Sequence, residues 1–272
     1  MGIMSMDHLF RRLAPISDRG WKLIDAEAKE RLRVPLGARR LVDFDGPHGW
    51  KYSATSLGST EPATDSPVAG VTGLRRRVLP LAEVRTEFAL SREQLLDYDR
   101  GAVDTDLTSI DNAAARMAKL ENSAVFHGWS NVGITGITEA TPHPEVPRVE
   151  DFEDYPGRIA DAVEILMRSG VEGPYALAVG PADHTAIIEA DDDGTPLVEH
   201  VRLILGGPIV WTPGVHGGVV LSLRGGDFLF ESGQDLAVGY DHHDDDHVHL
   251  YLEQTFSFRV ATPEAAIALA RK

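Results

Sequence analysis

The stretch RGGDFLFESGQDLAVGYDHHDDDHVHLYLEQTFSFRV, residues 224–260, decides the fold of this chain. In its last part, apolar and mostly polar side chains alternate along the sequence. The apolar side, interrupted by Gln254, holds Val248, Leu250, Leu252, Phe256, Phe258 and Val260, and the other side holds His249, Tyr251, Glu253, Thr255, Ser257 and Arg259. A period of two predicts a long strand with one buried face and one solvent face. Shorter strands are predicted over residues 227–231 and 235–240, so we expect an antiparallel sheet.

The most conspicuous polar cluster, DHHDDDHVH at residues 241–249, lies inside this stretch. Histidine and aspartate are good ligands for divalent ions, so a metal-dependent enzyme built on this cluster is one hypothesis. However, His247 and His249 project from one strand face, whereas His242 and His243 fall in the connection between two strands. A solvated acidic hairpin tip explains the same composition without a metal, and we expect that structure.

Composition narrows the class of protein. The chain has 272 residues, a net charge of −16 and no cysteine. The charge argues against nucleic acid as the main partner, because a phosphate-binding surface needs clustered Lys and Arg. The lack of cysteine excludes disulfides, thiolate zinc sites and a cysteine nucleophile. No apolar run is long enough to span a membrane, and MGIMSM does not resemble a secretory signal, so we expect a cytoplasmic protein that starts naturally at Met1 or Met6.

Helices are predicted where apolar residues recur every three or four positions. The predicted helices cover residues 17–34, 91–100, 108–129, 152–168, 181–190, 196–205 and 263–270, and further strands cover 175–179, 209–212 and 219–223. Ser17 and Ser91 stand where N-caps are expected, and Thr108 with Asp111 has the spacing of a capping box. The order of elements predicts a mixed α+β fold.

Residues 37–90 follow a different pattern, rich in Gly, Pro, Ser and Thr, with strand-like flanks. Between residues 53 and 72 the sequence SATSLGSTEPATDSPVAG has almost no bulky apolar side chain. We interpret this region as an extended arm or long hairpin that leaves the body of the subunit. Because it could bury little surface alone, another chain would order it. A floppy surface loop is the alternative.

The search for a catalytic site finds none. Asp191, Asp192, Asp193 and Gly194 form a predicted acidic turn, which lacks the ligand spacing of an EF-hand calcium loop. Copies of this turn around a symmetry axis would make a ring that attracts cations. The HGG at residues 216–218 is similar to an oxyanion-hole element, but no G-x-S-x-G nucleophile turn accompanies it. No P-loop, dinucleotide-binding fingerprint or H-E-x-x-H motif is present, so we predict no enzyme activity, no cofactor and no metal.

Short segments spread along the chain carry a family resemblance. They are LAPIS at 13–17, IDAEA at 24–28, GARRLVDFDGPHGW at 37–50, LPLAEVR at 79–85, FHGW at 126–129, GITGI at 133–137, GPY at 173–175, RGGDF at 224–228, GQDLAVGY at 233–240 and LYLEQTFSFRV at 250–260. Together they resemble encapsulins of the family 1 type. These are bacterial nanocompartment shell proteins that share the fold of tailed-phage major capsid proteins. The resemblance covers essentially the whole chain.

The resemblance implies a P-domain, an A-domain and an extended E-loop. The N-terminal helix region and start of the P-domain would be residues 1–48, the E-loop 49–88, the P-domain with its long helix 89–139, the A-domain 140–222 and the C-terminal P-domain sheet 223–272. It also implies an icosahedral homo-oligomer of 60 subunits or a multiple. The Asp191–Gly194 turn would then lie at a fivefold pore.

The same resemblance implies a docking site for the C-terminal peptide of a cargo enzyme. The residues matched to that site are Arg39, Asp43, Asp235, Leu236, Val238 and Tyr240. Leu236 and Val238 could equally belong to the core, and Arg39 and Asp43 could be a structural ion pair. The family's usual cargoes are ferritin-like proteins and dye-decolourising peroxidases. The helix at 91–100 has only Tyr98 where some relatives carry an aromatic residue linked to flavin, so no flavin is assigned.

These observations predict a non-enzymatic encapsulin shell subunit that encloses cargo, with iron storage or protection from oxidative stress as the associated processes. A phage or prophage major capsid protein is the alternative within the same fold. A metal-dependent enzyme using the cluster at residues 241–249 is the alternative from another class.

Overall fold

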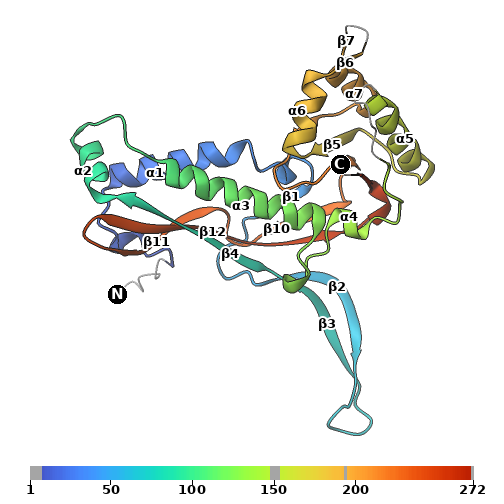
Figure 1. Ribbon diagram of the computed structural model, residues 1–272. Coiled ribbons are helices and arrows are strands. Elements are labelled where there is room, and N and C mark those ends of the chain that lie inside the picture. Colours follow the sequence, from blue (N-terminus) through green and yellow to red (C-terminus); the bar gives the residue numbers. More distant parts are fainter. Residues whose placement is uncertain (1–7, 148–153, 193–194, 271–272) are drawn as a thin grey trace.

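The protein is described by a computed structural model that covers residues 8–147, 154–192 and 195–270 (Figure 1). An elongated body contains a sheet with two long helices along it. A two-stranded arm projects from one side of the body, and a lobe of helices and strands stands at one end. Within the described ranges, no helix is long and apolar enough to cross a lipid bilayer.

The body sheet is built around β12 (His247–Val260). Along one edge of β12 run β10 (Phe228–Ser232) and β11 (Ala237–His243), and along the other runs β4 (Ala82–Ser91), all antiparallel to it. β1 (Asp43–Asp45) adds in parallel to β10. The predicted antiparallel arrangement of residues 227–260 is therefore confirmed.

The prediction that β12 has a solvent face is wrong. Tyr251, Glu253 and Ser257 are each at most 2% exposed, although they lie on the polar side of the alternation. A second layer covers that side, because His8 pairs with Glu253 at 3.2 Å and Thr55 hydrogen-bonds Ser257 at 2.8 Å. The buried polar groups of Glu253 and Ser257 therefore contact protein partners rather than water.

Helices cover the other face of the sheet: α1 (Asp18–Arg33), α2 (Arg92–Arg100) and α3 (Thr108–His127). The hydroxyls of Ser17 and Ser91 cap α1 and α2 as predicted, accepting bonds from backbone N–H groups. The prediction of a capping box at Thr108 is wrong. Leu107 is the N-cap, and the Asp106 carboxylate instead accepts the N–H of Thr108 at 2.9 Å.

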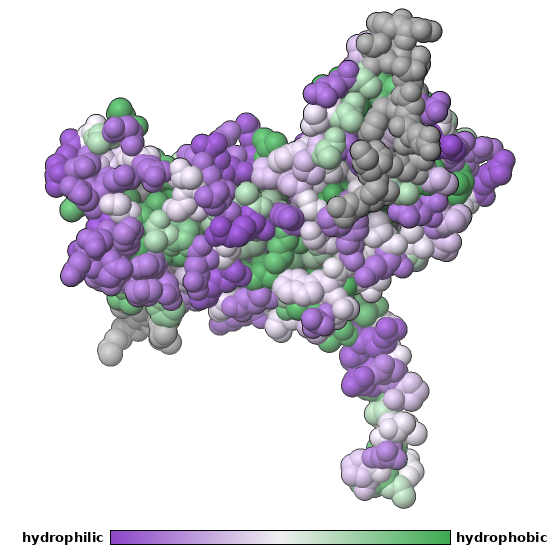
Figure 2. All heavy atoms as spheres, viewed as in Figure 1, coloured by the Kyte–Doolittle hydropathy of each residue, from purple (hydrophilic) through white to green (hydrophobic). Residues whose placement is uncertain are grey.

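The arm consists of β2 (Ala54–Ala63) and β3 (Gly73–Pro80), which pair only with each other within the described chain. Its sides carry Val68, Val71, Leu74 and Val78, which are between 49% and 68% exposed. Figure 2 shows the arm standing clear of the body with apolar atoms on its surface. The predicted hairpin is confirmed, and it leaves these apolar side chains largely exposed in the isolated chain.

The lobe is organised around a four-stranded sheet in the order β13–β9–β5–β8. Its elements are α4 (Ile137–Ala140), α5 (Tyr155–Arg168), β5 (Tyr175–Val179), α6 (Pro181–Glu189), β6 (Asp191–Asp192), β7 (Thr195–Pro196), α7 (Leu197–Leu205), β8 (Ile209–Trp211), β9 (Gly218–Ser222) and β13 (Ala266–Leu269). The predicted start of α5 at residue 152 lies outside the described residues.

The predicted C-terminal helix over residues 263–270 is wrong. Only Pro263–Ala265 forms a short 3-10 turn, and β13 follows it, antiparallel to β9. Alanines favour a helix in isolation, but Ile267 and Leu269 gain burial by joining the lobe sheet, where they are at most 5% exposed. Tertiary packing therefore overrides local helix propensity at this end of the chain.

Candidate functional site

An apolar groove with a volume of about 500 Å3 lies between α1 and β11. We call it the α1–β11 groove. Its lining consists of Arg11, Asp25, Ala28, Lys29, Leu32, Arg33, Leu36, Arg39, Asp235, Leu236, Ala237, Val238 and Leu252. The floor is apolar and the charged side chains stand around it, which is the usual composition of a ligand-binding site.

Helix α1 forms one wall because of the spacing of its residues. Asp25, Ala28, Lys29, Leu32 and Arg33 recur at three- and four-residue intervals, so they share one face of the helix. The alanine and the leucine are buried and the three charged side chains are exposed. The opposite wall comes from β11 and the residues just before it, where alternation places Leu236 and Val238 on one face.

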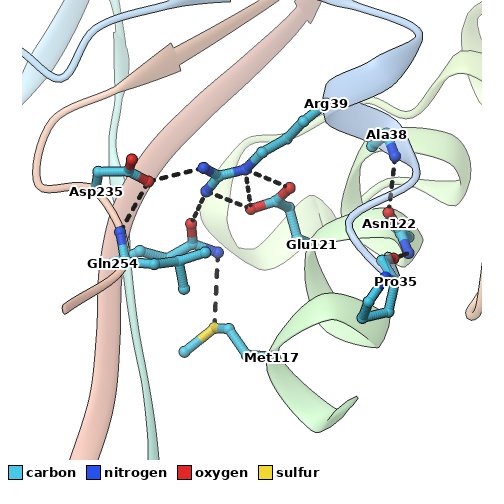
Figure 3. Close-up of polar contacts among 9 residues, drawn as sticks. Pro35, Ala38, Arg39, Met117, Glu121, Asn122, Asp235 and Gln254 are labelled. Carbon is cyan, nitrogen blue, oxygen red and sulfur yellow. Dashed lines mark hydrogen bonds and ion pairs between the residues drawn. The ribbon is translucent and has the colours of Figure 1, made fainter. Parts of the chain in front are cut away.

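Arg39 sits at the end of the groove in a hydrogen-bonded network (Figure 3). Its guanidinium makes a forked contact with the buried carboxylate of Glu121, with Nη2 to Oε2 at 2.8 Å. Nη1 donates to Asp235 at 2.7 Å and Nη2 to the Gln254 carbonyl at 2.7 Å. Gln254 also donates to the sulfur of Met117. The polar residue that interrupts the apolar side of β12 is therefore a partner of Arg39.

A second side chain of α3 fixes the backbone before Arg39. The amide of Asn122 accepts the N–H of Ala38 at 2.9 Å and donates to the carbonyls of Pro35 and Pro213, each at 2.8 Å (Figure 3). Asn122 is fully buried, so these bonds satisfy all of its polar groups in a dry environment. The turn that carries Arg39 is thereby held rigidly against α3.

The charge of Arg39 is balanced inside the protein. Burial opposes its charged form, but Glu121 and Asp235 more than offset that cost, so the pKa of Arg39 lies above its ordinary value. Arg39 consequently anchors the groove wall and has little spare charge for a ligand. The basic side chains of Arg11, Lys29 and Arg33 are at the rim, and Arg11 alone of these contacts an acidic lining residue, Asp25, at 2.7 Å.

The structure brings four of the six predicted docking residues together in the groove: Arg39, Asp235, Leu236 and Val238. Asp43 and Tyr240 lie elsewhere. The Asp43 carboxylate accepts the N–H of Gly226 at 2.7 Å and lines a separate polar cavity. The Tyr240 hydroxyl bonds the ring of His243 at 2.6 Å, and its N–H donates to Leu9. Arg39 and Asp43 do not form the ion pair that sequence analysis considered.

β6 and β7, which flank the predicted acidic turn between α6 and α7, lie at the far end of the lobe (Figure 1). Asp191 and Asp192 form β6 and pair with Pro196 and Thr195 of β7. Asp193 and Gly194 lie outside the described residues. Their role at a pore stays a prediction.

Residues 241–247 form an exposed hairpin tip, whereas Val248 is buried and His249 is half-buried. His242 and His243 extend β11 and pair with His249 and Val248, so the connection is shorter than predicted. The contact of the Asp244 carboxylate with His249 at 2.9 Å, together with the two backbone N–H bonds that it accepts at the turn, holds the pKa of Asp244 well below its ordinary value. Throughout residues 241–249, which are all described, no three ligand atoms converge as a metal site requires.

The sequence did not predict that α1 forms one wall of the groove, nor that Arg39 takes part in a hydrogen-bonded network behind it. Leu32 belongs to the apolar stripe of α1, and Lys29 and Arg33 each follow a residue of that stripe by one position, so the stripe was the available signal. Gln254 was visible as a polar residue on an apolar side. Nothing in the sequence pattern links Glu121 to Arg39, because 82 residues separate them.

Comparison with known proteins places this arrangement in a family. Residues 6–257 match a family model described as an encapsulating protein for peroxidase. The type 1 encapsulin shell protein of Rhodospirillum rubrum is 43% identical over 270 residues, which cover 97% of this chain and 96% of that protein. The chain belongs to the encapsulin shell protein family. The encapsulin of Rhodococcus erythropolis is 39% identical over 266 residues, covering 97% of this chain and 100% of its own.

Solved structures confirm the fold of this encapsulin. A virus-like particle from Pyrococcus furiosus aligns with a TM-score of 0.63 at 15% identity, covering 92% of this chain and 99% of that one. A chain from Mycobacterium phage Bobi aligns with a TM-score of 0.58 at 14% identity, covering 88% and 91%. The predicted α+β fold of tailed-phage major capsid proteins and the resemblance to encapsulins are therefore both confirmed.

Proposed function

We propose that this chain is a non-catalytic subunit of a closed icosahedral shell, built in the cytoplasm from copies of itself, that encloses a cargo enzyme. The observation that carries the proposal is the arm. Its exposed Leu74 and Val78 need a partner surface, and a second copy of the chain supplies one. Sixty is the smallest number of identical chains that satisfies icosahedral symmetry, and we propose that number.

The cargo is held, in this proposal, through its C-terminal peptide in the α1–β11 groove. Two features support that occupant. The floor is apolar, as an extended peptide with alternating anchors requires. Arg39 is balanced by Glu121 and Asp235, and Arg11 pairs with Asp25, so Lys29 and Arg33 are the lining charges with no acidic partner in the groove. These two cationic side chains at the rim, in a chain of net charge −16, suit a free terminal carboxylate.

A dye-decolourising peroxidase or a ferritin-like protein is the proposed cargo. The description of the matching family model, which names a peroxidase, favours the first. Weak binding at each groove is sufficient, because many grooves in one shell act together on an oligomeric cargo.

Size-exclusion chromatography with negative-stain imaging tests the assembly. We expect hollow particles of uniform diameter. A monomer or dimer would contradict the shell. Particles filled with nuclease-protected DNA would support a phage capsid instead. Replacing His242, His243, His247 and His249 together should spare assembly, and loss of a stoichiometric metal in that variant would revive the enzyme hypothesis.

Cargo docking is tested with Leu236→Asp and Lys29→Glu, which place a negative charge in the groove. The protein that co-purifies with parent shells is identified by mass spectrometry, and its C-terminal peptide is fused to a fluorescent protein. We expect fluorescence per shell to fall about tenfold, because one lost ion pair and one lost apolar anchor act on every groove. Lys22→Glu, on the same helix outside the groove, is the matched control. Equal loading of Leu236→Asp and Lys22→Glu shells would exclude the α1–β11 groove as the docking site.

A further inference from the structure

We propose that Asp45, His48 and Glu231 form a binding site for a divalent transition-metal ion. The site lies away from the α1–β11 groove, where β1 ends beside β10. His48 Nε2 is 3.1 Å from a Glu231 carboxylate oxygen and 3.4 Å from an Asp45 carboxylate oxygen. Each residue offers one ligand atom, and the three atoms all lie within 4.8 Å of one another.

These separations fit a shared ion. Imidazole nitrogen and carboxylate oxygen bind Zn2+ at about 2.0–2.2 Å, so neighbouring ligands of one ion stand about 3–3.5 Å apart. The two distances from His48 Nε2 to these carboxylate oxygens, 3.4 and 3.1 Å, fall in that range. Only small side-chain movements are therefore needed to place all three atoms around one ion. A hydrogen bond from His48 to Glu231 with Asp45 nearby is the competing explanation, and the experiment below separates the two.

The backbone holds the three residues in place before any ion arrives. Asp45 and Glu231 are register partners in the parallel pair of β1 and β10. His48 N–H donates to the Ser232 carbonyl at 2.9 Å, so the loop that carries the histidine lies on β10. Gly46 permits this close approach, because it has a φ of 124° and a side chain there would collide with the Ser232 carbonyl.

The donor set indicates the class of ion. One imidazole with two carboxylates suits Zn2+, Mn2+, Fe2+ or Co2+, while the lack of thiolates disfavours soft ions. The Asp45 side chain is 73% exposed, whereas that of Glu231 is 19% exposed. An ion therefore has an open path from solvent and open positions for water. Among the described residues, this trio alone brings three such ligand atoms together.

Binding would tie together two parts of the subunit. Residues 46–53 connect the body sheet to the start of the arm, and His48 is the ligand on that connection. An ion shared with Glu231 would fix the root of the arm to β10. We therefore expect Zn2+ to raise the thermal midpoint of the full chain, because a ligand that binds only the folded state stabilises it.

The test titrates the assembled full-length chain with Zn2+ against a chromophoric chelator, and with Co2+ by absorption. We expect one tight equivalent per chain, lost in His48→Ala and weakened at least about tenfold in the isosteric Glu231→Gln. His242→Ala is the matched control, since His242 contacts a carboxylate of the hairpin tip at 2.7 Å but has no third ligand.

Three results would overturn the proposal. They are a parent chain with no tight equivalent, His48→Ala with unchanged stoichiometry, and a loss in His242→Ala equal to that in His48→Ala. If His48→Ala does not fold, Glu231→Gln decides, because it removes a charge without changing the side-chain shape. Unchanged affinity in a folded Glu231→Gln chain then leaves only the hydrogen-bonded histidine.

Discussion

Arg39 joins three parts of the chain that are distant in sequence: the turn after α1, helix α3 and strand β12. We predict that Glu121→Ala destabilises the fold by about 3–5 kcal/mol, because it leaves a buried guanidinium with an incomplete set of partners. Denaturant unfolding followed by tryptophan fluorescence measures the change. Arg33→Ala removes only the exposed pair with Glu30, so we expect that control to stay within about 1 kcal/mol of the parent. Equal effects of the two variants would show that the network does not hold the wall.

His127 is the residue at which we expect acid sensitivity. Its Nε2 accepts the N–H of His216 at 3.0 Å, so Nδ1 carries the proton toward Thr138. Burial, and then the neighbouring His216, lower the pKa of His127 below its ordinary value of 6.5, and Glu139 only partly opposes this. Protonation of Nε2 would place its N–H against the backbone N–H of His216. The charged form of His127 is therefore favoured in the unfolded chain.

The stabilising contribution of neutral His127 is therefore present in full above pH 6.5 and is lost as pH falls through its lowered folded-state pKa. Thermal midpoints at pH 7.5 and pH 5 measure this loss. We expect the parent to lose more between the two pH values than His127→Gln, which cannot titrate. A His242→Gln control should behave as the parent. An identical drop in parent and His127→Gln would assign acid sensitivity to other groups.

At the scale of elements, periodicity predicted which side chains share a face but not how many layers cover it. The bounds of β5 were predicted to the residue, because a short apolar segment between turn residues has clear ends. The polar side of β12 was misassigned, since His8 and Thr55 cover it from remote positions. The predicted docking residues on the groove wall came from family resemblance. The pairing of Arg39 with Glu121 could come only from the folded chain.

The arm is the element whose exposure has a direct consequence. Leu74 is 68% exposed in the isolated chain, and burial of a leucine side chain contributes about 1.5–3 kcal/mol. We predict that Leu74→Asp prevents assembly, because each copy would bury a charge against its neighbour, whereas Leu74→Met assembles normally. Size-exclusion chromatography and negative-stain imaging give the readout. Normal particles from a folded Leu74→Asp chain would mean that this side of the arm does not contact another subunit.

At the scale of the whole molecule, net charge and the lobe tip act together. If five lobes meet around an axis, the turns containing Asp191 and Asp192 form an acidic ring, and a positively charged solute is concentrated there. We predict that replacing Asp191, Asp192 and Asp193 together by Asn slows cation entry about tenfold at low ionic strength, with a smaller effect at high salt.

The measurement is the quenching of an enclosed fluorescent protein by Cu2+, with neutral acrylamide as a second quencher. Acrylamide entry should not change, because the substitution alters charge and barely alters the size of the opening. Asp104→Asn, at an exposed loop of the body, is the matched control. Unchanged Cu2+ entry would contradict the prediction that this turn lines the pore. Equal slowing of acrylamide would mean that the variant narrows the opening, and the electrostatic role of the ring would then be rejected.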